Sequence, residues 1–144
     1  MEITIYTDGG ARNNPGPAAI GVVIQKQGQT LKKYNEFIGE ATNNEAEYQA
    51  IVFALKKAKL LFGKKKIKEM EIEICSDSEL AIKQLNHDYK IKETNLQSLF
   101  IKVWNLTIDF KQVSFKYILR EKNKEADRLV NQALDEQERT QTLL

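Results

Sequence analysis

The stretch that decides the fold is residues 44–62, which read NEAEYQAIVFALKKAKLLF. Apolar side chains recur along it with helical spacing, at Ile51, Ala54, Leu55 and Ala58. This spacing places them on one face of an amphipathic helix, and such a face needs a second layer to pack against. The residues upstream supply that layer, because their apolar positions follow the pattern of strands. The stretch therefore marks the point where a sheet-forming region gives way to helices.

Three strands are predicted before this helix. Apolar side chains alternate with polar ones in the first strand, fill the second and return in the third. The expected ranges are 3–8, 18–26 and 31–38, with turn-rich sequence at 9–10, 13–17 and 28–29. The short connection between the second and third strands favours an antiparallel meander.

Downstream of the helix, strands and helices alternate. The sequence predicts a strand at 70–75, a helix at 78–87, a helical stripe at 96–104, a strand at 113–119 and a helix at 123–138. Strands separated by helices are expected to pair in parallel through right-handed crossovers. The predicted fold is therefore α/β: a mixed five-stranded sheet, three strands antiparallel and two parallel, with helices on both faces.

Length and composition indicate one ordinary globular domain over residues 1–144. Hydrophobic residues make up 42% and charged residues 29% of the 144 positions, which leaves no room for a second core. Residues 136–144 extend the last helix, dock through Leu143 and Leu144, or form a flexible tail, and the sequence leaves these alternatives open. We expect a monomer.

Cysteine usage and the N-terminus favour a reducing, cytoplasmic setting. The single cysteine, Cys75, excludes an intramolecular disulfide and lies in a strand-like run, where a buried, inert thiol is expected. Nothing at the N-terminus resembles a signal peptide, and the apolar run at 18–24 is too short to span a bilayer. The net charge of +2 does not by itself indicate a nucleic-acid binder. The cluster of Lys64, Lys65, Lys66 and Lys68 is read as a solvated loop.

Four acidic residues stand out, although each has a local explanation. Asp8 precedes two glycines and suits a turn. Glu47 lies three residues after Asn44, as in a capping box. Asp77 suits a helix N-cap, and Asp127 suits the positive end of the last helix dipole. None of these residues, taken singly, indicates an enzyme.

The expected direction of these side chains favours a common site. Glu47 and Asp127 share the apolar, sheet-facing stripes of their helices, and carboxylates aimed at an interior are costly unless paired or bound to metal. Asp8 and Asp77 stand at the carboxyl ends of strands expected to be parallel, the sheet edge where ligands bind. The four carboxylates are therefore expected to converge.

A cluster of carboxylates without basic partners needs a cation, because like charges repel and raise one another's pKa. Hard oxygen ligands, with no histidine or thiolate among them, select Mg²⁺ or Mn²⁺ over zinc. Two such ions about 4 Å apart are the arrangement used for in-line displacement at phosphorus. The chemistry indicated is phosphodiester hydrolysis.

The segments around these residues resemble the type 1 ribonuclease H family. All four acidic positions of the family are filled, in order, over nearly the whole chain. The motifs that carry the resemblance are Tyr6-Thr7-Asp8-Gly9-Gly10, Asn14-Pro15-Gly16-Pro17, Thr42-Asn43-Asn44-Glu45-Ala46-Glu47, Ser76-Asp77-Ser78 and Asn123-Lys124-Glu125-Ala126-Asp127. The resemblance implies a ribonuclease H-like fold and an endonuclease that cuts the RNA strand of RNA–DNA hybrids.

The resemblance also implies a role for each carboxylate and a cofactor of two Mg²⁺ ions, with Mn²⁺ as a substitute. Asp8 would bridge the two ions, and Asp127 would complete the site of the ion that activates water. Glu47 and Asp77 would hold the ion that stabilises the departing 3′-oxygen. The products would carry 5′-phosphate and 3′-hydroxyl ends.

Contacts to the hybrid are implied for a second group of residues. By the resemblance, the Asn14 loop and the 42–44 turn lie along the minor groove and touch 2′-hydroxyls, which distinguish RNA from DNA. Turn and cap duty explains the asparagines as well. The expected substrate-binding residues are Gly9, Gly10, Asn14, Thr42, Asn43, Asn44 and Ser78.

The chain departs from the family pattern in three places. Residues 117–122 lack the loop histidine of many relatives, and Arg120 either takes part in catalysis there or pairs at the surface with Glu121 or Glu125. Residues 87–95 are too few for the basic protrusion of some relatives. Glu79 stands where some relatives have an amide. The missing histidine keeps a second hypothesis open, a non-catalytic hybrid-binding module with a decayed site. A nuclease of the same superfamily acting on branched DNA is disfavoured by the asparagine-rich turns.

Overall fold

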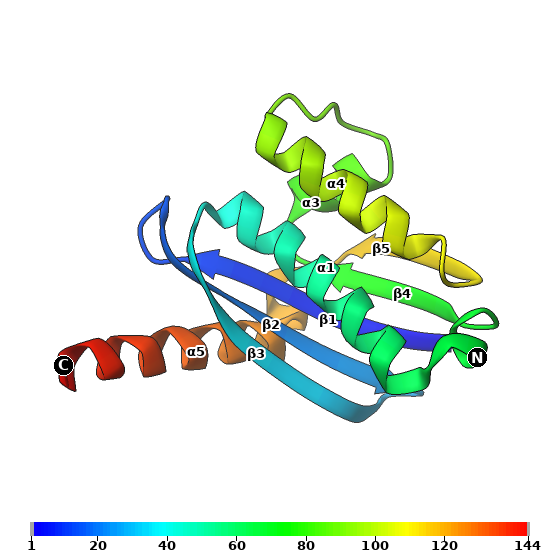
Figure 1. The fold of residues 1–144 in the computed structure, drawn as a ribbon, viewed down its shortest axis with the longest axis horizontal. Coiled ribbons are helices and arrows are strands. Elements are labelled where there is room, and N and C mark those ends of the chain that lie inside the picture. Colours follow the sequence, from blue (N-terminus) through cyan, green and yellow to red (C-terminus); the bar gives the residue numbers. More distant parts are fainter. Residues whose placement is uncertain (1, 144) are drawn as a thin grey trace.

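Five strands form one mixed sheet in the order β3-β2-β1-β4-β5 (Figure 1). The structure is a computed structural model and describes residues 2–143. The strands are β1 Glu2–Ala11, β2 Gly16–Lys26, β3 Gln29–Ala41, β4 Glu71–Ser76 and β5 Gln112–Tyr117. The β1–β2 and β2–β3 pairs are antiparallel, and the β1–β4 and β4–β5 pairs are parallel. The predicted sheet is confirmed.

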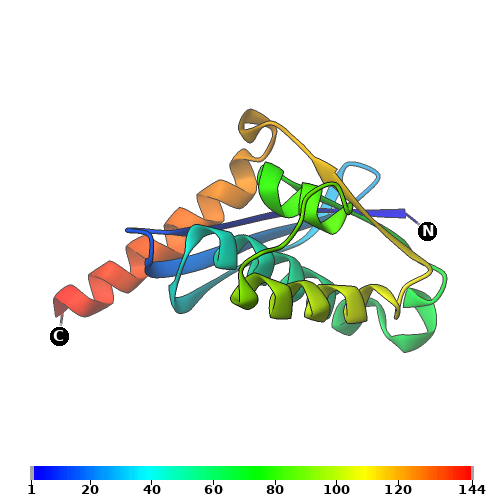
Figure 2. The ribbon, with the colours of Figure 1, turned by 90° about the horizontal axis from the view of Figure 1, so that it is seen from above.

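Helices cover both faces of the sheet, as predicted. They are α1 Asn43–Phe62, α2 Lys64–Ile67, α3 Glu79–Leu85, α4 Thr94–Thr107 and α5 Lys124–Leu143, with a short 3-10 helix at Arg120–Lys122. Helices α1 and α4 lie on one face and α5 lies on the other (Figure 2). Helix α1 packs against β1 and β2, and α5 packs against β2 and β3.

The core forms mainly between α1 and the central strands. The predicted apolar stripe of α1 is fully buried, in one cluster with the inward side chains of β1, β2 and β4. Cys75 lies in β4 with a relative exposure of 3%, and burial raises the pKa of its thiol to about 12. The expectation of a buried thiol is confirmed, and the raised pKa disfavours the reactive thiolate.

The first strand is longer than predicted. Gly9 and Gly10 were expected in a loop, but β1 continues through them to Ala11 and pairs with β2. A β-carbon added to Gly9 would lie 2.2 Å from the Ala46 carbonyl oxygen, so the glycine serves a close approach of α1 to the strand. The parallel ladder with β4 ends at Thr7 and Ser76, so Asp8 and Asp77 still follow its last pair.

Two helix caps differ from those expected. Thr42, and not Asn44, caps α1: the Thr42 hydroxyl accepts a hydrogen bond from the Glu45 amide, and the Glu45 carboxylate accepts one from the Thr42 amide. Ser78, and not Asp77, caps α3 by accepting a hydrogen bond from the Ala81 amide. Glu47 and Asp77 are thus free of the cap duties that would have explained them.

The lysine cluster and the C-terminal segment are both helical. Lys64, Lys65 and Lys66 belong to α2, so the predicted loop is wrong, although the lysines are exposed as expected. Helix α5 extends through residues 136–143, and Leu143 is 87% exposed, which excludes docking through that side chain. Leu144 lies outside the described residues. Over residues 2–143, no helix has the length and apolar character needed to cross a membrane.

Candidate active site

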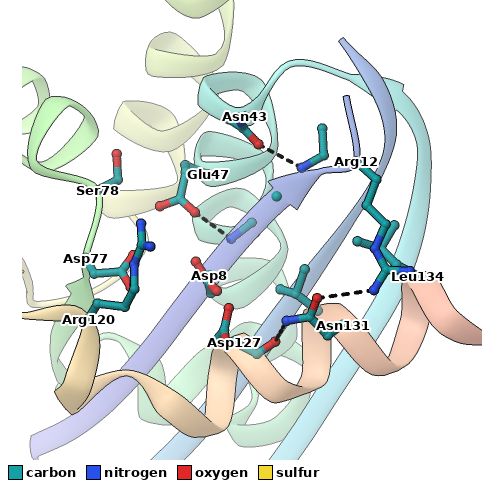
Figure 3. Close-up of a pocket in the computed structure, with 14 residues that line it drawn as sticks. Asp8, Arg12, Asn43, Glu47, Asp77, Ser78, Arg120, Asp127, Asn131 and Leu134 are labelled. Carbon is teal, nitrogen blue, oxygen red and sulfur yellow. Dashed lines mark hydrogen bonds and ion pairs between the residues drawn. The ribbon is translucent and has the colours of Figure 1, made fainter. Parts of the chain in front are cut away.

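Three carboxylates from three different elements meet beside the end of the parallel ladder. Asp8 comes from β1, Glu47 from α1 and Asp77 from the residue after β4, and each offers an oxygen within 4.8 Å of the others. They line an open pocket of about 380 Å³ (Figure 3). Asp8 and Glu47 are each 8% exposed, so the predicted inward direction of Glu47 is confirmed.

Glu47 is held by hydrogen bonds from both central strands. The Gly9 amide donates to Glu47 Oε1 over 2.7 Å, and the Ser76 hydroxyl donates to Glu47 Oε2 over 3.1 Å. Ser76 is 1% exposed, and its oxygen also accepts a hydrogen bond from the Ser78 amide at 3.0 Å. No role was predicted for Ser76 from the sequence. Its only signal is a hydroxyl at the last position of an apolar strand, directly before Asp77.

The electrostatics of the three carboxylates are unfavourable without a cation. Burial raises the pKa of Asp8, and repulsion from Glu47 raises it further. Burial also raises the pKa of Glu47, against the hydrogen bond from the Gly9 amide. Burial raises the pKa of Asp77, and the Arg120 guanidinium acts in the opposite sense. A bound cation would neutralise the three charges, and an all-carboxylate donor set fits hard divalent ions.

Asp127 lines the same pocket but is exposed, which corrects the prediction that it points into the interior. Figure 3 shows its carboxylate near that of Asp8. The helical spacing from Asp127 to the buried Val130 is as expected. The prediction fails because the first turn of α5 lies at the rim of the pocket, where the same helix face meets solvent. Asp127 is near enough for its charge to raise the pKa of Asp8 and Asp77.

Arg120 extends over the pocket from the 3-10 helix, with a side chain that is 90% exposed. Its Nε lies 4.0 Å from Asp77 Oδ2. Glu125 instead pairs with Arg128 and Lys33, at 2.6 Å and 3.0 Å. Among the described residues, Arg120 forms an ion pair with Asp77 and with neither Glu121 nor Glu125, so the predicted surface pair is wrong.

The residues expected to contact substrate fall into two groups. Gly9, Gly10, Asn43 and Ser78 line the pocket. Asn14 is tied to this lining, because its Oδ1 accepts a hydrogen bond from the Asn43 amide at 3.0 Å. Thr42 serves the α1 cap. Asn44 lies in the first turn of α1.

Arg12 and Asn131 also line the pocket, and neither was predicted from the sequence. The Arg12 guanidinium lies 2.8 Å from Asp135 and 2.7 Å from Glu138, and it donates to the Asn131 oxygen over 3.3 Å. These contacts tie the β1–β2 turn to α5. Their partners are more than one hundred positions away in the sequence, so no local pattern could have revealed them.

Comparisons with known proteins point to a single family. Residues 6–133 match the family described as "Reverse transcriptase-like". The chain is 37% identical over 132 residues to ribonuclease HI of Halobacterium salinarum, across 91% of this chain and 63% of that protein. It is 34% identical over 137 residues to a bifunctional protein of Mycobacterium tuberculosis, across 94% of this chain and 36% of that protein. The chain therefore spans about a third of the mycobacterial protein's length.

Solved structures of the same kind superpose on most of the chain. LC11-RNase H1, solved in complex with an RNA/DNA hybrid, matches with a TM-score of 0.89 and 47% identity, covering 93% of this chain and 97% of that one. RNase H1 from Halobacterium salinarum matches with a TM-score of 0.86 and 36% identity, covering 94% and 99%.

Proposed function

The chain belongs to the type 1 ribonuclease H family, and from that premise we propose that it is an endoribonuclease acting on RNA–DNA hybrids. It would hydrolyse the RNA strand and leave 5′-phosphate and 3′-hydroxyl ends. The observation that carries the proposal is the meeting of Asp8, Glu47 and Asp77 within 4.8 Å in an open pocket. A relative with 47% identity has been solved with an RNA/DNA hybrid, which supports the choice of substrate.

We propose that Asp8, Glu47, Asp77 and Asp127 hold two divalent cations, Mg²⁺ with Mn²⁺ as a substitute. The donor set fits, because the pocket lining supplies carboxylate oxygens and contains neither histidine nor cysteine among the described residues. Bound cations of this kind neutralise charge on the scissile phosphate and lower the pKa of attacking water.

The protein's own groups would orient the hybrid and the carboxylates. Hydrogen bonds from Gly9 and Ser76 fix both oxygens of Glu47, so this side chain is set before ligand arrives. Asn43 donates through its backbone amide to Asn14, and its side-chain oxygen accepts a hydrogen bond from the Ala11 amide. The side chain lines the pocket, where it would reach the minor groove. Arg120, exposed beside Asp77, would contact the phosphate backbone of the substrate or product.

The setting proposed for this activity is a cytoplasmic monomer. The buried Cys75 thiol suits a reducing compartment, since the chain has no second cysteine to pair with it. Light scattering of the purified chain at assay concentration tests the oligomeric state.

A cleavage assay tests the function. The protein is incubated with labelled RNA–DNA, RNA–RNA and DNA–DNA duplexes, each with Mg²⁺, Mn²⁺ or chelator. We expect loss of the RNA strand in the hybrid alone, and only with metal. Hybrid binding without cutting in either metal would support the non-catalytic module instead.

Two matched variants locate the activity. Asp77→Asn removes one charge from the pocket, and cleavage is expected to fall by at least a hundredfold. Asp88→Asn removes one charge from the exposed loop after α3, outside the pocket lining, and is expected to cut normally. Equal rates for the two variants contradict the assignment of the site.

A further inference from the structure

Asn123 lies at the junction between the 3-10 helix and α5, and its side chain is not used by the proposed chemistry. The residue is 1% exposed. Its Nδ2 donates a hydrogen bond to the Thr7 carbonyl over 2.9 Å. Across residues 2–143, its Oδ1 is the one buried side-chain nitrogen or oxygen without a hydrogen-bond partner.

The ordinary explanation for an asparagine in this place is a helix cap. A capping asparagine accepts a hydrogen bond through Oδ1 from a backbone amide in the first turn. Here Oδ1 accepts none from the described residues, although Asn123 directly precedes α5. The side chain therefore does not cap the helix, and the hydrogen bond that its Nδ2 donates is directed across to β1.

The contacts of Asn123 reach three of the elements that carry carboxylates. Thr7, whose carbonyl it holds, directly precedes Asp8 in β1. The Asn123 backbone carbonyl accepts a hydrogen bond from the Asp127 amide at 3.1 Å. The side chain also interacts with Asp77, where it opposes the dominant effect of burial on the pKa of that carboxyl. A single buried residue thus links β1, the end of β4 and the start of α5.

We propose that Asn123 is a positioning residue that sets the relative places of Asp8, Asp77 and Asp127 for divalent cations. The inference rests on the proposed function, because it concerns the same metal site. The residue makes no contact with the reacting atoms and acts through the carboxylates it aligns. Residues that orient metal ligands in this way typically change metal affinity about 10–100-fold when they are replaced.

A metal titration followed by thermal unfolding tests the inference without any substrate. Tm is measured at increasing Mg²⁺ and at increasing Mn²⁺ for the wild type and for Asn123→Ala. The metal midpoint is the metal concentration that gives half of the full rise in Tm. The variant is expected to need about tenfold more metal. Its kcat is expected to fall at limiting metal and to recover at saturating metal, with the KM for hybrid unchanged.

Asn35→Ala is the matched control. Asn35 also donates its side-chain amide to a backbone carbonyl of α5, that of Leu129, over 3.0 Å, but it does not line the pocket. The control is expected to lower Tm while keeping the metal midpoint within about twofold of wild type. A metal midpoint that shifts equally in both variants, or in neither, overturns the proposal.

Asn123→Ser separates positioning from capping and covers a failure of the alanine variant to fold. Serine caps a helix as well as asparagine does but lacks the amide that reaches Thr7. The serine variant is expected to keep the raised metal midpoint, and a wild-type midpoint in this variant overturns the proposal. A wild type that binds metal with a rise in Tm but does not cut hybrid contradicts the proposed function alone. A wild type whose Tm does not respond to either cation contradicts both.

Discussion

The two adjacent glycines of β1 face different surroundings, so one methyl group has different effects at the two positions. A β-carbon at Gly9 would lie 2.2 Å from the Ala46 carbonyl oxygen, whereas one at Gly10 would lie 3.7 Å from Val130 Cγ1. Gly9→Ala must push the start of α1 away and lengthen the hydrogen bond to Glu47. We expect a loss of about 1–3 kcal/mol in the free energy of unfolding and weaker metal binding. Denaturant unfolding with and without Mg²⁺ measures both effects.

Gly10→Ala is the internal control for this prediction, since its new methyl group meets ordinary van der Waals space. It is expected to leave the denaturation midpoint and the metal response close to wild type. A Gly9→Ala protein as stable and as responsive to metal as Gly10→Ala contradicts the close approach.

The buried carboxylates predict how the stability of the metal-free protein depends on pH. Burial raises the pKa of both Asp8 and Glu47 above the values they have in the unfolded chain, and repulsion from a neighbouring carboxylate adds to it, from Glu47 on Asp8 and from Asp77 on Glu47. The folded state therefore holds more protons, and its stability falls as pH rises from about 4 through the raised pKa values, by up to about 1.4 kcal/mol per pH unit for each proton released. Metal-free Tm is expected to drop between pH 5 and pH 8.

Asp8→Asn supplies the comparison for this pH dependence. The amide removes one of the repelling charges, so the variant is expected to show a higher Tm than wild type at pH 8 without metal, and a shallower slope. Saturating Mg²⁺ is expected to flatten the wild-type slope and to have little effect on the variant. A wild-type Tm that rises with pH in the absence of metal contradicts the assigned shifts.

At the scale of elements, Arg12 joins the β1–β2 turn to the second half of α5. Its ion pairs to Asp135 and Glu138 involve half-exposed side chains, and such pairs contribute about 1 kcal/mol or less. Arg12→Ala is expected to change Tm little. Because the turn that carries Asn14 loses this contact, the KM for hybrid is expected to rise by up to about fivefold with kcat nearly unchanged.

Arg128→Ala controls for the loss of a positive charge near the substrate. Arg128 pairs with Glu125 on its own helix and does not line the pocket, so its replacement is expected to leave KM close to wild type. Steady-state kinetics at two salt concentrations compare the variants. An equal rise in KM for both would show that overall charge, and not the turn, decides affinity.

The elements of this fold follow from hydrophobic periodicity, whereas several boundaries do not. The strand patterns before α1, the short connection between the second and third strands, and the alternation of strands and helices after α1 were sufficient to predict the mixed sheet. The extension of β1 through Gly9 was not predictable from the sequence. The glycine is needed there because α1 packs closely against it, and β2 and β3 separate α1 from Gly9 along the chain. The same is true of Thr42 as the α1 cap, where two local candidates compete and the structure selects one.

The sequence was sufficient to predict which residues form the candidate site, but less so to predict their exposure and their contacts. Glu47 points inward as its spacing requires. Asp127 obeys the same spacing but is exposed. Helical periodicity predicts which face of the helix a side chain lies on, but it does not predict where along the helix that face extends past the sheet into solvent. Ser76, Arg12 and Asn123 act through contacts with distant segments, which a single sequence does not encode in any local pattern.

At the scale of the whole molecule, the hydrophobic core and the acidic pocket are separate. The main core lies between α1, α4 and the sheet, and none of its buried residues lines the pocket. Removing divalent metal with a chelator is therefore expected to abolish cleavage without unfolding the chain, unlike a small zinc domain. Far-UV circular dichroism and a cooperative thermal transition in chelator check this. A metal-free protein with no cooperative transition contradicts it.

The accessible surface is larger than that of a compact protein of this mass, because the end of α5 projects beyond the sheet (Figure 1). The accessible surface is 8442 Å², compared with roughly 7600 Å² expected for a compact protein of this mass. The projecting turns are mostly exposed from Asp135 onward. They therefore add surface with little core, and the contacts of Arg12 are among the few that hold them.

Cys75 is a natural probe of how often the centre of the sheet opens. It is the single thiol of the chain, it lies in a strand with a paired neighbour on either side, and burial suppresses its thiolate. A maleimide-type reagent can reach it only when β4 separates from the sheet, so the labelling rate under native conditions reports the frequency of that opening. Mass spectrometry can follow it without any engineered probe. Because β4 leads directly into Asp77, slower labelling on addition of Mg²⁺ would measure how strongly an occupied pocket holds the centre of the sheet closed.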